Sequence, residues 1–127
     1  MRNNMSASLP QWQGETVPMV QSTVRISERQ RNNLDRITNA TNAPSIGASI
    51  RLMTVTESQL VKDGIRKPDD YIPTTEPREY TLGFKLRESD KIALFELRYF
   101  YNAKSISDVV CHLLNHAIRV LDEKDGE

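Results

Sequence analysis

The chain has 127 residues, a single cysteine and a formal net charge of zero, from 17 basic and 17 acidic residues. This length fits one domain, the lone cysteine excludes an intrachain disulfide, and no apolar run is long enough to span a bilayer. The polar amino-terminal residues lack the apolar core of a signal peptide, so we expect a cytoplasmic protein with no membrane contact.

The first part of the chain predicts an arm followed by a strand and two helices. Residues 1–19 are rich in Asn, Ser, Gln and Pro, a composition that predicts a flexible arm. Apolar and polar side chains then alternate over residues 20–27, which predicts one short, half-buried strand. Ser27 is placed to cap a short polar helix, and Ser45 to cap a second helix. Strand, helix and helix together define a first unit over residues 20–61.

The second part of the chain predicts the same order of elements. A charged linker with three prolines covers residues 62–79. A second alternating strand and a first helix follow, and Ser105 opens a last helix with a broad apolar surface. This second unit covers residues 80–121, and an acidic tail covers residues 122–127.

The two predicted units align as an internal repeat. Residues 22–61 shifted by sixty positions match residues 82–121 without a gap, with six identical pairs among forty. Ordinary residue usage would give roughly two or three identical pairs, and the apolar positions also match. Since a unit of about forty residues is too small to hold a core alone, we expect the two units to bury one shared core.

Each unit has one alternating strand and two helices, with a basic residue on the outward strand face and a serine at the start of the second helix. This arrangement resembles the ribbon-helix-helix family of DNA-binding proteins. This family includes the Arc, MetJ and CopG repressors. The matching stretches are residues 21–27 and 81–87, each with the helices that follow. The resemblance implies a mainly α fold with one two-stranded antiparallel ribbon. Two copies in one chain imply an intramolecular pseudo-dimer, as in the TraY proteins of conjugative plasmids.

In this family the ribbon enters the major groove, whose base pairs present distinct donor and acceptor patterns. The residues expected to read bases are Gln21, Thr23, Arg25, Thr81 and Lys85. A solvated strand face would be polar as well, and this is the alternative interpretation. Gly83 stands where the first unit has Thr23 and offers no side chain, so we expect the target to be an imperfect inverted repeat. A ribbon bulge or a close backbone approach would also explain this glycine.

The amino termini of the second helices suit DNA phosphates, because free N–H groups and the positive helix end attract anions. The residues expected to bind phosphate are Ser45, Ile46, Lys104, Ser105 and Ile106. Both serines would act as helix caps in any case.

One helix face of the second unit has no counterpart in the first. Ile92, Phe95 and Tyr99 form an apolar stripe that indicates a partner face. The matching positions of the first unit are all polar: Asn32, Asp35 and Asn39. Three segments could cover the stripe: the linker's Tyr71–Ile72, Trp12 of the arm, or a second copy on adjacent DNA. We expect the linker to cover it.

Asp108, His112 and His116 recur every four residues on the last helix, a spacing at which two histidines can hold a transition metal. No further ligand lies nearby in the sequence, and a helix pair between Asp108 and His112 explains the spacing. We therefore expect neither a metal nor another cofactor.

The sequence favours a sequence-specific double-stranded DNA-binding protein that regulates transcription, as a repressor. One alternative is a relaxosome accessory protein at a plasmid transfer origin, as the TraY-like layout suggests. Another is an antitoxin or adaptor whose ribbon no longer reads DNA. An enzyme is not expected, because a strand-helix-helix pair leaves little room for a deep pocket and no catalytic motif is present.

Overall fold

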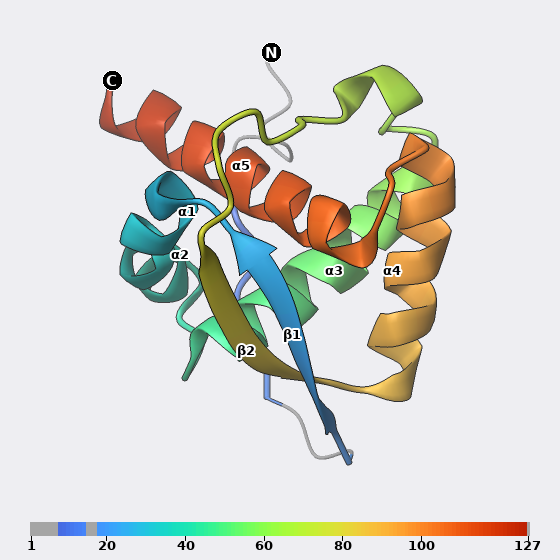
Figure 1. Cartoon of the computed structure of the whole chain (residues 1–127), viewed down its shortest axis with the longest axis horizontal. Helices are drawn as coiled ribbons and strands as arrows, with labels where there is room; N and C mark the ends of the chain where they lie inside the picture. Colours follow the sequence, from blue (N-terminus) through green and yellow to red (C-terminus); the bar gives the residue numbers. More distant parts are fainter. Residues whose placement is uncertain (1–7, 15–17, 127) are drawn as a thin grey trace.

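The computed structural model describes residues 8–14 and 18–126 (Figure 1). Its elements in chain order are β1 (Val20–Ile26), α1 (Glu28–Asn32), α2 (Leu34–Thr41), α3 (Ile46–Lys62), the 3₁₀ turn η1 (Pro68–Asp70), β2 (Tyr80–Leu86), α4 (Glu88–Tyr101) and α5 (Ile106–Asp125). The predicted mainly α fold is confirmed, with one two-stranded antiparallel sheet that pairs the two β-α-α units. None of the described helices is long and apolar enough to cross a membrane.

The two strands pair over their whole length, and Thr23 lies opposite Gly83. These two residues are also equivalent in the sixty-residue repeat, so the axis that relates the two units passes between them. The inward side chains are apolar and buried: Val24, Ile26, Phe84 and Leu86. The predicted alternation is confirmed over residues 21–26 and 81–86, whereas Val20 is exposed and Ser27, at the end of the predicted first strand, is buried.

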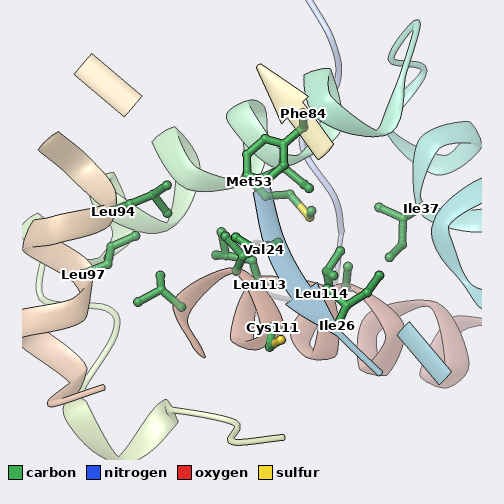
Figure 2. Packing of buried hydrophobic residues seen from close by; sticks show 14 of the residues in the cluster. Val24, Ile26, Ile37, Met53, Phe84, Leu94, Leu97, Cys111, Leu113 and Leu114 are labelled. Atoms are coloured by element: carbon green, nitrogen blue, oxygen red, sulfur yellow. The ribbon is translucent and has the colours of Figure 1, made fainter. Parts of the chain in front are cut away.

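Each strand packs on the second helix of the other unit. β1 contacts α5, whereas β2 contacts α3, and both helices run beneath the sheet (Figure 1). Figure 2 shows Val24 and Ile26 close to Leu113 and Leu114 of α5, and Phe84 close to Met53 of α3. Because each inward face is covered by the other unit, the two units share one core.

The first helices of the two units differ. α4 is continuous, whereas the matching helix of the first unit is divided into α1 and α2 at Asn33, whose side chain donates to the backbone oxygen of Arg29 at 2.8 Å. Both units then turn at an asparagine in the left-handed region, Asn42 with φ 56° and Asn102 with φ 54°. Asparagine tolerates this conformation better than most residues, so it ends both helices.

The described part of the predicted arm lies against the end of α2. The Trp12 N–H donates to the Thr41 backbone oxygen at 2.9 Å, and the Gln11 amide donates to Ala40 at 3.0 Å. Residues 1–7 and 15–17 of the arm lie outside the described residues. The acidic tail continues α5, where Asp122 and Asp125 pair with Arg36 of α2 at 2.8 and 2.6 Å.

The linker is fixed to α5 by side-chain hydrogen bonds to its backbone. The Ile72 N–H donates to His112 Nδ1 at 3.0 Å, and the Asn115 amide donates to the Ile72 oxygen at 3.2 Å. Gln30 of α1, which is fully buried, donates to Asn115 Oδ1 at 3.0 Å and to Thr74 Oγ1 at 2.7 Å. These bonds connect the linker to both units.

Candidate nucleic-acid interface

The outer face of the ribbon carries six exposed residues in three cross-strand pairs: Gln21 with Lys85, Thr23 with Gly83, and Arg25 with Thr81. The repeat makes the Gln21–Lys85 end equivalent to the Thr81–Arg25 end. Each end of the ribbon therefore presents one cation and one neutral hydrogen-bonding side chain. All five side chains that the sequence nominates for base reading share this surface.

Gly83 interrupts this surface without interrupting the ladder. The register continues through it, so the glycine marks no bulge. A Cβ built there would lie 2.9 Å from Gln21 Nε2, with no other heavy atom nearby, so no neighbouring backbone requires the glycine. The gap between the two ends is therefore filled by the flexible Gln21 amide.

The Arg25 side chain reaches the linker. Its Nε and Nη2 donate to the Arg78 backbone oxygen at 3.3 and 3.1 Å. The Arg78 guanidinium in turn pairs with Asp108 of α5 at 2.5 Å. A base contact from Arg25 requires its guanidinium to leave the linker, whereas its equivalent Lys85 has no such contact in the described part of the chain.

The second helices donate hydrogen bonds to the backbone oxygens of the two ribbon cations, Lys85 and Arg25. Arg51 of α3 donates to the Lys85 oxygen at 2.8 Å, and its equivalent Cys111 of α5 donates to the Arg25 oxygen at 3.4 Å. Burial raises the pKa of the Cys111 thiol, which keeps the donated proton in place. Cys111 is a free, buried cysteine.

The second helices begin beside the ribbon, as the phosphate hypothesis requires. Ser45 Oγ accepts from the Ala48 N–H, and Ser105 Oγ accepts from the Asp108 N–H, both at 3.2 Å, which confirms both predicted caps. The Arg25 N–H donates to Ser107 Oγ at 3.4 Å, so the start of α5 adjoins one ribbon cation.

The start of α3 occupies the equivalent place beside Lys85. A Cβ on Gly47 would lie 3.7 Å from the Lys85 nitrogen and only 3.2 Å from Phe84 Cβ, so this glycine permits the close approach of helix and strand. The first N–H groups of an α-helix have no intrahelical partner, and Ile46 and Ile106 are the first residues of α3 and α5.

Asp108 changes the electrostatics of the α5 helix start. Its carboxylate accepts from the Lys104 N–H at 3.1 Å and pairs with Arg78. An acidic side chain there opposes a phosphate, and the Arg78 guanidinium offsets that charge. Lys104 is exposed beside this pair. Arg78 is not among the residues that the sequence nominates for this helix start.

A buried polar cluster centres on Glu57 of α3. The carboxylate accepts from the Tyr101 hydroxyl at 2.5 Å, from His112 Nε2 at 2.8 Å and from Arg66 Nε at 3.0 Å. His112 Nδ1 accepts the Ile72 N–H, so the ring is neutral with its proton on Nε2. Burial raises the pKa of Glu57, but the hydrogen bonds from His112 and Tyr101 outweigh it and lower the pKa to about 2.

The two predicted metal-spaced histidines belong to this cluster. Both ring nitrogens of His112 are hydrogen-bonded, and His116 Nε2 lies 3.0 Å from Arg66 Nη2. No group of three potential metal ligands occurs among residues 8–14 and 18–126. The spacing of Asp108, His112 and His116 therefore reflects separate contacts, since Asp108 pairs with the linker's Arg78.

The apolar stripe of α4, formed by Ile92, Phe95 and Tyr99, is open to solvent. These side chains are 54%, 57% and 90% exposed. The expectation that the linker covers them is wrong, because Tyr71 instead stacks on Tyr101 with ring centroids 5.6 Å apart. Trp12 does not cover them either, since its ring faces Arg51 at 6.0 Å.

Comparison of the chain with protein-family models, curated proteins and solved structures gives no match.

Proposed function

We propose that the chain is a sequence-specific double-stranded DNA-binding protein of the ribbon-helix-helix type, a cytoplasmic repressor that acts by occupying a promoter. The observation that carries this proposal is the symmetric placement of Arg25 and Lys85 on the exposed ribbon face, each beside the start of a second helix. A ribbon of two strands fits the major groove, and helix starts on either side suit the flanking phosphates.

The ribbon geometry sets the spacing of the two half-sites. Arg25 and Lys85 each lie two residues from the Thr23–Gly83 pair, in opposite directions along the ribbon. Four strand residues span about 13 Å, which is close to four base-pair steps of about 3.4 Å. The two cations would thus read guanines roughly four base pairs apart, within an inverted repeat whose halves differ because the ribbon ends differ.

Selection of bound duplexes from a random library, at one moderate salt concentration, tests the proposal. The wild type should enrich an imperfect inverted repeat, and the Arg25→Ala/Lys85→Ala variant should enrich none. The Arg29→Ala/Arg119→Ala variant removes two other exposed cations and is the matched control, which should retain the site. Failure of the wild type to enrich any sequence would refute DNA reading by the ribbon.

Replacement of Gly83 by threonine would make the centre of the ribbon symmetric. We expect a stability change within about 1 kcal/mol, because threonine suits a strand and its Cβ would displace only the Gln21 amide. The site that this variant selects should be more nearly palindromic than that of the wild type. Thr23→Gly, which places glycine at both central positions, is the reciprocal control. An unchanged site would show that position 83 does not contribute to sequence readout.

A relaxosome accessory protein at a plasmid transfer origin is the second candidate, favoured by the presence of both β-α-α units in one chain. An antitoxin or adaptor is the third, favoured by the exposed α4 stripe and by the retention of Arg25 on the linker. The selected sequence separates the first two candidates through its position in promoters or transfer origins, and lack of enrichment favours the third.

A further inference from the structure

We propose that the apolar stripe of α4 is a self-association surface, through which two copies of the protein pair with their α4 helices side by side and parallel. Ile92, Phe95 and Tyr99 form a contiguous exposed patch of one aliphatic and two aromatic side chains. The largest contiguous apolar patch on a protein surface is often a functional one. This proposal is independent of DNA binding.

The pattern along α4 is that of a two-stranded coiled-coil contact. Ile92, Phe95 and Tyr99 follow one another at spacings of three and four residues, which are the a, d and a positions of a heptad. Lys91 then occupies a g position on one flank, and Glu96 an e position on the other. Neither Lys91 nor Glu96 has an ion-pair partner within the described residues, so both charges are available to a second copy.

The flanking charges select the orientation of the pair. In a parallel pair each g residue faces the e residue five positions later on the other helix, so Lys91 would face the second copy's Glu96, twice by symmetry. In an antiparallel pair each flank of α4 faces the same flank of the second copy's α4. The basic flank with Lys91 and Arg98 would then lie against the basic flank of the other copy. Like charges there would repel, so the surface is complementary to a second copy in the parallel orientation.

The size of the surface predicts a weak, closed dimer. The exposed parts of the three side chains amount to roughly 400 Å² per copy, against about 800 Å² per partner in a standard interface. An adjoining groove of about 670 Å³ between α3 and α4, lined by Val61, Phe95 and Phe100 among others, would add contact area. The equivalent face of the first unit is polar, so each molecule has one such apolar surface. Pairing of two molecules covers both surfaces, and the association ends at the dimer.

Sedimentation equilibrium of the full chain over a concentration series tests the pairing. The wild type should shift from monomer to dimer, without larger species, as the concentration rises to the high micromolar range. Phe95→Asp should remain monomeric at every concentration. Asn39→Asp, at the first-unit position that matches Tyr99, is the control and should dimerise like the wild type. A wild type that stays monomeric throughout would overturn the proposal and leave the stripe to a different protein.

Charge exchange and cross-linking test the orientation without disturbing the fold. Lys91→Glu and Glu96→Lys should each weaken dimerisation several-fold, and the two together should restore it. Tyr99→Cys should form a disulfide-linked dimer on oxidation, because equivalent residues of parallel helices approach within the Cα range of a disulfide. The native thiol of Cys111 is buried, so the wild type is the control for this reaction. Dimerisation without cross-linking or charge rescue would overturn the parallel arrangement.

Discussion

Replacement of Glu57 by leucine is expected to lower the free energy of unfolding by about 3–5 kcal/mol, the cost of breaking a buried charge pair by removing one partner. Glu57 is 3% exposed, and its carboxylate accepts three hydrogen bonds, from Tyr101, His112 and Arg66. Leucine would fill much of the space but would leave the two neutral donors and the guanidinium without an acceptor. Urea unfolding at neutral pH, followed by circular dichroism, measures the change.

Two further variants define the cause of this loss. Glu57→Gln keeps an oxygen acceptor but removes the charge, so it should cost less than the leucine variant, about 1–3 kcal/mol. Glu123→Gln removes an exposed carboxylate and should change stability by no more than about 0.5 kcal/mol. Stability of Glu57→Leu equal to that of the wild type would show that the cluster contributes nothing net to the fold.

The arrangement of the two units could be predicted from the sequence because local patterns determine it. Alternation in 20–27 and the helix caps Ser45 and Ser105 depend only on nearby residues, and the repeat supplied the pairing of the units. The register was not predicted; in the structure the equivalent residues Thr23 and Gly83 meet at the axis. The five base-reading candidates therefore came together on one face as the alternation predicted.

The contacts of the linker could not be predicted, because they join residues far apart in the chain. Nothing near Arg78 in the sequence indicates that its backbone oxygen accepts from Arg25 and its guanidinium pairs with Asp108. Of the residues in the buried polar cluster, only Glu57 could be recognised from the sequence, because it falls among the apolar positions of α3 beside Met53 and Leu60. A charged residue in such a row indicates a buried polar partner, and the two histidines of α5 were the available candidates.

The Arg25 contact matters most for the proposed function, because it makes the two ends of the ribbon unequal before any DNA binds. The Lys85 side chain is free to reach a base, whereas the Arg25 guanidinium must exchange the Arg78 oxygen for a base acceptor. The net gain from the Arg25 end is therefore smaller than a bidentate contact to guanine alone would give. Under the proposed function, the two half-sites would thus differ because of the linker as well as because of Gly83.

Acidification is expected to destabilise the protein in two separate steps, of which the first comes from His116. Burial and the charge of Arg66 lower the pKa of His116 to about 4, against an ordinary value of 6.5. Between these values the unfolded chain binds a proton that the folded protein does not, so stability falls as the pH drops from about 6.5 to 4. The shift corresponds to about 3 kcal/mol, at 1.36 kcal/mol for each pKa unit.

The second step comes from Glu57, whose pKa of about 2 lies below the ordinary 4.5. Its contribution is complete above pH 4.5 and is lost as the pH falls from there toward 2, so the two steps occupy adjacent windows. His116→Thr introduces the residue found at the matching position 56 and should abolish the upper step while leaving the lower one. Urea unfolding across pH 2–8 distinguishes them, and an upper step that persists in this variant would assign it to another group.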